Sequence, residues 1–316
     1  MKTTIDQKTV ANDLKEMMRK AFVGSDSILD LVLAGFLAGL HVLIEDIPGV
    51  GKTTLARSLA KSAGLDYARI QFTPDLLPGD ITGVTVWSPE KREFVFKSGA
   101  IMHQFILADE VNRASSRTQS ALLEAMQEKS VTVDGSTYPL PEPFFVVATQ
   151  NPLSFSGTFQ LPEAQLDRFG VSLSLGYPNH EDEITILDRV KQDALLDALE
   201  PVMSSDVILA IKEEVRNIRV DRRIQDFVVA IADGTRRSPT LKLGMSPRAT
   251  GHLVLAAQAW AYLAGRDFVV PEDVLEVAAP VIQHRLVPTA QARMENKTPT
   301  DILMSIIDRI PKPAGL

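Results

Sequence analysis

Short runs of consecutive hydrophobic residues recur along the first half of the chain, separated by segments with helical periodicity. The runs are HVLIE (41–45), YARIQF (67–72), FILAD (105–109), FFVVATQ (144–150) and VSLSLGY (171–177). Continuous runs, rather than alternation, are typical of strands buried on both faces of a parallel sheet. Helices are expected as a pair within 7–39, broken near Gly24, and at 51–63 and 116–128. Alternation of strands and helices predicts a doubly wound α/β sheet.

Two segments interrupt this alternation and are predicted to be hairpins. VTVW (84–87) and EFVF (93–96) flank the polar sequence SPEKR. SVTVDGSTYPL (130–140) turns at Asp134-Gly135, which is a strong hairpin signal. We expect both hairpins to lie on the surface of the sheet.

Beyond Pro178 the strand pattern fades and helical periodicity continues to the end of the chain. Helices are expected at 181–196, 205–217, 221–236, 247–264, 271–284 and 298–310, the fifth starting at Pro271. A chain of 316 residues is long enough for two domains. We therefore predict an α/β core over 1–177 and an all-α domain over 178–316.

Composition narrows the classes of function. The net charge is −7, which gives the whole surface no electrostatic attraction to nucleic acid or anionic membranes. The absence of cysteine excludes disulfides and thiolate metal sites, and the five histidines lack metal-ligand spacing. The most apolar stretch, 31–44, is shorter than the ~18–20 residues of a membrane span, and no signal peptide is visible. A cytoplasmic protein without membrane insertion is expected.

The sequence DIPGVGKT (46–53) follows a predicted buried strand and precedes a predicted helix, as a phosphate-binding loop requires. Glycines allow the backbone to point successive N–H groups at phosphate oxygens, and the helix N-terminus adds attraction. A lysine can reach the β- and γ-phosphates, and a threonine hydroxyl can bind Mg²⁺. The first glycine of the common pattern is replaced by Asp46. We predict binding of ATP and Mg²⁺ by Pro48, Gly49, Val50, Gly51, Lys52, Thr53 and Thr54.

Two acidic residues end the buried run FILAD-E (105–110). Asp109 is expected to hold Mg²⁺ and Glu110 to orient and polarise the attacking water. Strands often end in acidic residues, so this pair alone is a weak signal. Together with the phosphate loop upstream it indicates a nucleotide site.

Three further polar residues are catalytic candidates. Asn151 follows the fourth predicted strand and can position water or sense the γ-phosphate; the alternative is an Asn-Pro turn. Arg168 can stabilise transition-state charge in a neighbouring subunit's site, unless it forms a surface salt bridge with Asp167. Arg248 begins a helix, where the helix dipole disfavours a cation, so we expect it to reach back to the γ-phosphate.

In this order the five elements resemble Walker A, Walker B, sensor 1, arginine finger and sensor 2 of the AAA+ superfamily. EDIPGVGKT, LADEVNRA, QEKSVTVDG, ATQNP, LPEAQLDRF and SPRA look like signatures of its MoxR family, which also shows the aspartate variant of the phosphate loop. The resemblance implies an AAA+ P-loop core with inserted hairpins at 84–96 and 130–140, a helical lid and a hexameric homo-oligomer. It further implies that Arg113 contributes to the subunit interface.

The same resemblance implies a chaperone-like ATPase. Members of this family typically act with a protein carrying a von Willebrand factor A domain, in metal insertion or maturation of client complexes. Two alternatives remain: an ATP-binding scaffold with little turnover, and a nucleic-acid motor. Glu110 disfavours the scaffold. The net charge, and the lack of an aromatic and basic tract, make nucleic acid an unlikely partner.

Overall fold

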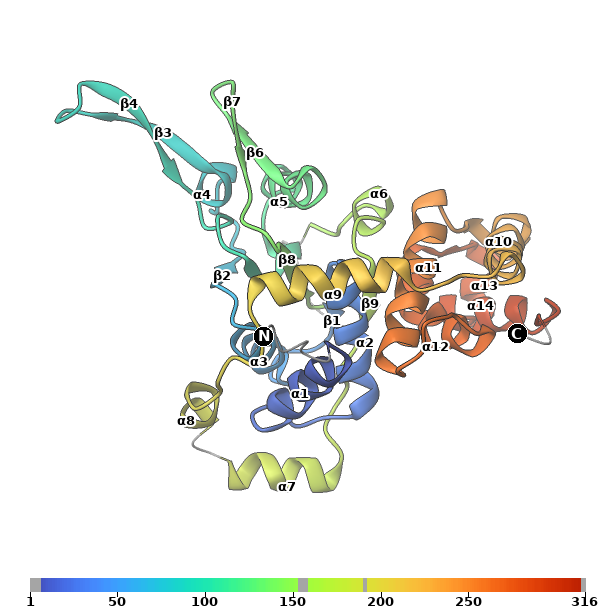
Figure 1. Cartoon of the computed structure of the whole chain (residues 1–316). Helices are drawn as coiled ribbons and strands as arrows, with labels where there is room; N and C mark the ends of the chain where they lie inside the picture. The colour runs from blue at the N-terminus through green and yellow to red at the C-terminus, as the bar shows by residue number, and fades with distance from the viewer. Residues whose placement is uncertain (1–6, 153–158, 190–191, 314–316) are drawn as a thin grey trace.

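The computed structural model describes residues 7–152, 159–189 and 192–313. At its centre lies a five-stranded parallel sheet with the strand order β2-β5-β8-β1-β9 (Figure 1). Its strands are β1 (Val42–Glu45), β2 (Tyr67–Gln71), β5 (Phe105–Asp109), β8 (Phe145–Gln150) and β9 (Val171–Leu173). All five are predicted strands, and they form the parallel sheet that the hydrophobic runs indicated.

Burial on both faces explains why these strands read as continuous apolar runs. On β1, Val42 and Ile44 belong to one hydrophobic cluster, whereas Leu43 belongs to the cluster on the opposite face. On β5, Leu107 and Ala108 divide between the two clusters in the same way. Successive side chains point to opposite faces, so every position of a strand covered on both sides must be apolar.

Helices flank the sheet and begin and end at local sequence signals. Gly39 closes α2 in the left-handed region (φ 72°), and Ser115 caps α5 by accepting the backbone N–H of Thr118. The helices of the N-terminal part are α1 (Gln7–Arg19), α2 (Asp26–Ala38), α3 (Lys52–Ser62), α4 (Pro78–Thr82), α5 (Ser116–Glu128), α6 (Glu163–Leu166) and a 3-10 turn (Val111–Arg113).

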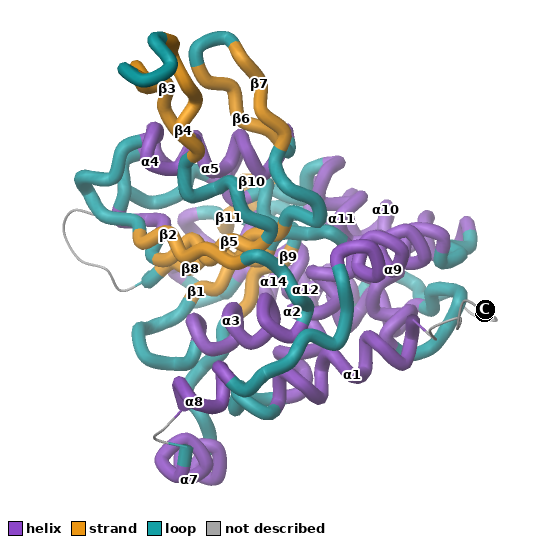
Figure 2. The backbone as a smooth tube through the Cα atoms, turned by 60° about the vertical axis from the view of Figure 1, so that its left-hand side comes forward, coloured by secondary structure: helices purple, strands orange, loops and turns teal. Residues whose placement is uncertain are grey.

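Both predicted hairpins are present and project from the same end of the molecule (Figures 1 and 2). Phe96 of one stacks on Tyr138 of the other, with ring centroids 3.9 Å apart. Asp134 and Gly135 both have positive φ (48° and 80°), as the tight turn between two paired strands requires. The hairpin strands are β3 (Gly83–Ser88), β4 (Glu93–Ser98), β6 (Ser130–Val133) and β7 (Ser136–Pro139).

The C-terminal part is mainly helical. Its helices are α7 (His180–Asp188), α8 (Gln192–Asp197), α9 (Ser205–Asn217), α10 (Arg222–Arg237), α11 (Pro247–Leu263), α12 (Pro271–Ile282), α13 (Ala290–Met294), α14 (Pro299–Ile307) and a 3-10 turn (Gln283–Arg285). The single helix expected over 181–196 is present as α7 and α8, with residues 190–191 outside the described part. Residues of α9, α11 and α12 share one hydrophobic cluster with α2 and one face of the sheet. The predicted boundary near residue 177 therefore remains a prediction.

Two details differ from the sequence prediction. A small antiparallel sheet pairs β10 (Leu241–Leu243) with β11 (Val287–Pro288) inside the part expected to be all helical. Strands of two or three residues are too short to show a period of two, so their pattern was not visible. The last strand of the large sheet ends at Leu173 rather than residue 177, and beyond it the N–H groups of Leu175 and Gly176 donate to the Asp46 carboxylate instead of to a strand.

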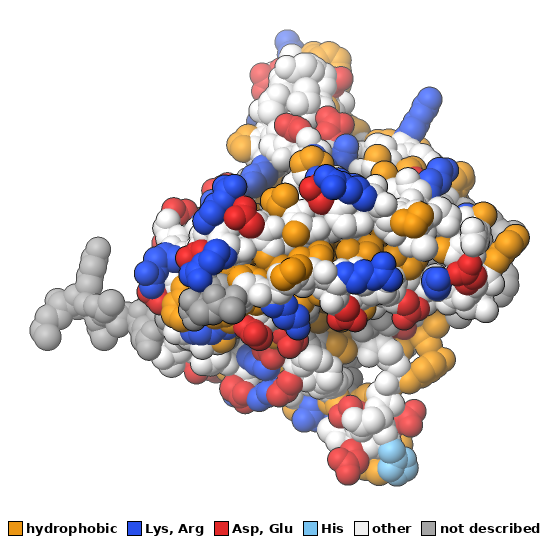
Figure 3. All heavy atoms as spheres, turned by 90° about the vertical axis from the view of Figure 1, so that its right-hand side faces the viewer, with side chains coloured by type: hydrophobic (Ala, Val, Ile, Leu, Met, Phe, Trp, Pro, Cys, Tyr) orange, Lys and Arg blue, Asp and Glu red, His pale blue; other side chains and the backbone are white. Residues whose placement is uncertain are grey.

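Figure 3 shows the face formed by the C-terminal helices, on the right of Figure 1. Basic, acidic and hydrophobic side chains are interspersed over this face, without a continuous basic stripe. Among the described residues, no helix has the length and apolar character needed to cross a membrane.

Acid is expected to destabilise the fold through His41. Its Nδ1 accepts the Val146 N–H (3.1 Å), and its Nε2 lies 3.4 Å from the Met126 carbonyl oxygen. Burial, with smaller contributions from Lys212 and Lys129, lowers the pKa of His41 to about 4. The unfolded chain binds this proton near the ordinary pKa, so stability is present above pH ~6.5 and is lost as pH falls toward 4.

We expect His41→Gln to remove part of this dependence. Between pH 7 and 5 the wild type should lose up to about 2 kcal/mol more unfolding free energy than the variant, measured by urea titration. His180→Gln is the control, because His180 is exposed on α7. Parallel pH curves for the wild type and His41→Gln would refute this assignment.

Candidate active site

The phosphate-loop sequence forms the connection between β1 and α3. Gly49 (φ 87°) and Gly51 (φ 93°) are both in the left-handed region, and Gly51 is the N-cap of α3. The glycines are thus needed for their backbone conformation, and the unpaired N–H groups of the α3 N-terminus lie at the loop. The loop has the backbone form that anion binding requires.

Lys52 is the first residue of α3 and is 8% exposed. Its Nζ donates a hydrogen bond to the Asp46 carbonyl oxygen (2.6 Å). Burial lowers its pKa, while the charges of Asp46, Asp109 and Glu110 oppose that shift. The lysine is therefore held at the loop, within the electrostatic field of the two acids predicted to act with it.

Asp46, the departure from the common loop pattern, has a structural role in this chain. Its Oδ2 accepts hydrogen bonds from the Ser174 hydroxyl (2.8 Å), the Leu175 N–H (2.7 Å) and the Gly176 N–H (2.8 Å), and its Oδ1 accepts the Ile47 N–H (2.8 Å). Burial acts to raise the pKa of this carboxyl, but the hydrogen bonds outweigh burial and the pKa lies below its usual value. Through these hydrogen bonds Asp46 holds the segment after β9 against the start of the phosphate loop.

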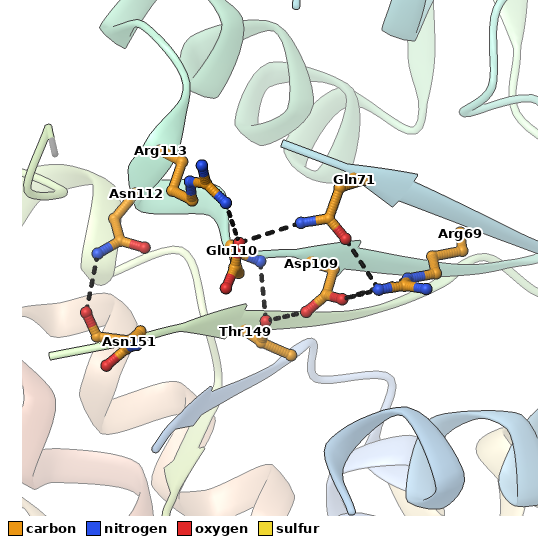
Figure 4. A network of polar contacts seen from close by, with 8 residues as sticks. All are labelled: Arg69, Gln71, Asp109, Glu110, Asn112, Arg113, Thr149 and Asn151. Carbon is orange, nitrogen blue, oxygen red and sulfur yellow. Dashed lines mark hydrogen bonds and ion pairs between the residues drawn. The ribbon is translucent and has the colours of Figure 1, made fainter. Parts of the chain in front are cut away.

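The acidic pair lies at the carboxyl end of β5, between β2 and β8 (Figure 4). Asp109 is 8% exposed; its Oδ1 accepts the Thr149 hydroxyl (2.6 Å) and its Oδ2 accepts Arg69 Nη2 (2.6 Å). Asp109 and Thr53 line the same cavity, and their carboxylate and hydroxyl are the kind of oxygen ligands that Mg²⁺ prefers. A metal at Asp109 would share that carboxylate with Arg69 or displace it.

Glu110 has a left-handed backbone (φ 56°), which is uncommon for a residue with a side chain. Its N–H donates to Thr149 Oγ1 (2.9 Å), and its carboxylate accepts Arg113 Nη1 (2.8 Å) and Gln71 Nε2 (3.2 Å). Figure 4 shows these side chains converging on Glu110 from neighbouring strands and the turn after β5. In this state the candidate base is held by two donors.

Asn151 lies just beyond β8, in agreement with its predicted place in the chain. Its backbone carbonyl accepts a hydrogen bond from Asn112 Nδ2 (3.1 Å), and Figure 4 shows it on the Asn112 side of Glu110. Asn151 is not among the described residues that line the adjoining cavity. The function of its side chain remains a prediction.

A cavity of about 500 Å³, called here the phosphate-loop cavity, joins these parts. It contains all of the predicted nucleotide- and metal-binding residues and Glu110, namely Pro48, Gly49, Val50, Gly51, Lys52, Thr53, Thr54, Asp109 and Glu110. Phe22, Gly24 and Ile28, from the α1–α2 connection and the start of α2, add an apolar wall. Of the described arginines only Arg69 lines it, and Arg69 is paired with Asp109.

Arg168 and Arg248 lie together, but not at this cavity. They line a second cavity of about 490 Å³, between the α/β part and helices α9 and α11. Asp167 holds the start of α11 there, accepting the Ser246 hydroxyl (2.8 Å) and lying 3.9 Å from Arg248. Asp167 thus pairs with Arg248 and Arg285, and the alternative Asp167–Arg168 salt bridge is not formed. Arg248 therefore does not line the phosphate-loop cavity of its own subunit, and its contact with a γ-phosphate remains a prediction.

The sequence analysis missed several residues of the acidic site. Arg69, Gln71 and Thr149 are single polar residues within or at the end of strands, where no local pattern marks them. Their signal is the sheet register, which pairs Gln71 with Asp109 on adjacent strands.

Comparisons with known proteins agree with this fold. Residues 41–171 match the model of the ATPase family associated with various cellular activities (AAA), and residues 233–306 match the AAA lid domain. The protein is thus an AAA+ ATPase family member with a parallel sheet and a lid.

Two relatives and one solved structure show which AAA+ family the chain belongs to. YeaC of Bacillus subtilis is 46% identical over 94% of this chain and 93% of its own length. Chaperone MoxR1 of Mycobacterium tuberculosis is 38% identical over 94% of this chain and 80% of its own length. A crystal structure from Cytophaga hutchinsonii, of a protein assigned as an ATPase, superposes with a TM-score of 0.90 at 35% identity, covering 97% of this chain and 96% of the other. The chain belongs to the MoxR family.

Asp46→Asn should destabilise the protein and weaken nucleotide binding. An amide nitrogen in place of Oδ2 would face three donors, and each lost hydrogen bond at a buried acceptor costs ~1–3 kcal/mol. We expect a lower urea midpoint and weaker binding of a fluorescent ATP analogue, because residues 175–176 line the phosphate-loop cavity. Asp134→Asn is the matched control, since Asp134 occupies an exposed turn where asparagine is tolerated. Equal stability of Asp46→Asn and wild type would contradict the fastening role.

Proposed function

We propose that the chain hydrolyses ATP with Mg²⁺ at the phosphate-loop cavity, within a head-to-tail ring, expected to be a hexamer. Arg168 and Arg248 of one subunit complete the site of the next. The observation that carries this proposal is their position: both arginines lie in a cavity other than the one lined by Lys52. A contact between two different faces of one chain is heterologous, and such contacts form a ring where the rotation between subunits closes.

In this proposal each residue of the site has a defined role. The loop N–H groups and Lys52 bind the β- and γ-phosphates, and Thr53 and Asp109 hold Mg²⁺. Bound Mg²⁺ would neutralise charge on the phosphates. Glu110 polarises the attacking water once Gln71 and Arg113 release its carboxylate, and Asn151 positions that water. Guanidinium groups from the neighbour then stabilise the charge that develops on the transferred phosphoryl group.

We also propose that the ring remodels client protein complexes, in maturation or metal insertion, with a partner carrying a von Willebrand factor A domain. The relative named Chaperone MoxR1 supports a chaperone-like role. The projecting hairpin β3–β4 supports contact with a protein, because Trp87 and Phe94 are 53% and 71% exposed and pack against each other there.

Arg168→Ala is expected to abolish turnover while ATP binding persists. ATP hydrolysis per subunit should rise across a hundredfold range of protein concentration for the wild type. It should fall by about 10³-fold in the variant, the scale of an engaged arginine finger. Arg222→Ala is the control, because Arg222 is 81% exposed on α10. If hydrolysis per subunit does not depend on protein concentration or on Arg168, the ring proposal is wrong. If the wild type binds ATP but does not hydrolyse it, the alternative of an ATP-binding scaffold is favoured.

Mixing two inactive variants tests whether the site is shared. Arg168→Ala and Glu110→Gln should each be inactive alone, because each lacks one half of the site. Mixed rings contain interfaces that pair an intact Arg168 with an intact Glu110. We therefore expect partial recovery of ATPase activity on mixing. Absence of recovery in rings shown to contain both variants would mean that the two residues act in separate sites.

A further inference from the structure

The second cavity contains a buried lysine that the proposed ATPase mechanism does not use. Lys212 lies on α9, is 9% exposed, and lines the cavity together with Arg168 and Arg248. Its Nζ lies 5.1 Å from the centroid of the Phe36 ring. Within the described residues its ammonium forms no ion pair with a carboxylate. A charge buried in this way costs stability unless something compensates it.

The other charges of the second cavity compensate it only in part, because Glu142 favours the charged form of Lys212 while Lys129 and Arg216 disfavour it. Lys129 lies 3.9 Å from Glu142, and Arg216 lies 3.9 Å from Glu213, so each acid already has a basic partner. Five lysine and arginine side chains line this cavity against two glutamates. The lining of this cavity therefore has an excess of positive charge.

The two histidines of the cavity are neutral near pH 7. Burial lowers the pKa of His41 to about 4 and, with the charges of Arg285 and Arg248, lowers that of His252 to about 3. Burial, Lys129 and Arg216 lower the pKa of Lys212 to about 8, opposed by Glu142. Lys212 is thus largely protonated at neutral pH, although its surroundings disfavour the charge.

We propose that the second cavity binds a phosphoryl group and that Lys212 is a third cationic ligand for it, beside Arg168 and Arg248. Phosphate oxygens accept hydrogen bonds from ammonium and guanidinium groups and would compensate the buried charge. Two sources present this chemistry: the ATP of the neighbouring subunit, and free phosphate. The first source rests on the proposed function; the second does not require a ring.

A structural role predicts different behaviour. The aliphatic stem of a lysine packs against apolar groups, and its ammonium gains from the face of an aromatic ring. Lys212→Met keeps the packing volume and removes the charge. If Lys212 only packs on Phe36, this substitution leaves phosphate binding and ATP turnover unchanged. If Lys212 binds phosphate, the variant binds phosphate more weakly, while its stability without phosphate is equal to or higher than that of the wild type.

The first experiment measures binding of inorganic phosphate. The Lys52→Ala background weakens the phosphate loop, so the remaining binding reports on the second cavity. Phosphate should raise the melting temperature of this protein over a chloride control of equal ionic strength. Adding Lys212→Met should weaken that binding at least 10-fold, whereas Lys242→Met, at an exposed lysine of β10, should not. Equal phosphate binding with and without Lys212→Met overturns the proposal; Lys212→Gln serves if the methionine variant does not fold.

The second experiment identifies the source of the phosphoryl group. In otherwise wild-type protein, Lys212→Met should lower kcat at least 10-fold with KM for ATP unchanged, if the neighbour's ATP enters the cavity. Mixing with Glu110→Gln should then restore activity. Loss of phosphate binding with unchanged kcat supports free phosphate as the ligand. If Arg168→Ala leaves turnover unaffected but Lys212-dependent phosphate binding persists, the ring fails and the anion site remains.

Discussion

The position of β8 between β1 and β5 is the constraint on which the rest of the structure depends. In a parallel sheet all carboxyl ends lie at one edge, so the loop after β1 and the acids after β5 face each other across the end of β8. Thr149 on β8 makes this arrangement explicit, because its hydroxyl donates to Asp109 and accepts the Glu110 N–H. One side chain of the middle strand thus contacts the carboxylate of the first acid and the backbone of the second.

Much of this edge could be predicted from the sequence, because its signals are local. A lysine after two glycines, between an apolar run and a helix, has few alternative interpretations, and Lys52 lies where that pattern requires. The hairpin turn at Asp134-Gly135 was predictable for the same reason, since the residue pair itself selects the backbone conformation. The parallel sheet followed from strands that must be apolar on both faces.

The rest depends on contacts between segments far apart in the chain. Arg248 could be recognised as unusual at a helix start, but its direction is set by the Asp167–Ser246 hydrogen bond, which joins α11 to the segment before β9. Lys212 is an ordinary lysine of an amphipathic helix in sequence, and only the packing of α9 makes it buried. Arg69 on β2 is exposed, and only the strand pairing that brings β5 beside it gives Arg69 its ion pair with Asp109. Single residues whose role arises from tertiary packing leave no periodic or motif signal.

The two cavities differ in the charges that surround their buried lysines, Lys52 and Lys212. In the phosphate-loop cavity the charges of Asp46, Asp109 and Glu110 all oppose the effect of burial on Lys52, although its pKa is still lowered. In the second cavity the charges of Lys129 and Arg216 act with burial to lower the pKa of Lys212, and only Glu142 opposes them. A protein that retains an uncompensated buried cation accepts lower stability unless an anion arrives from outside. The lining of the second cavity therefore carries an excess of positive charge, which an anionic group from a neighbour or from solution would offset.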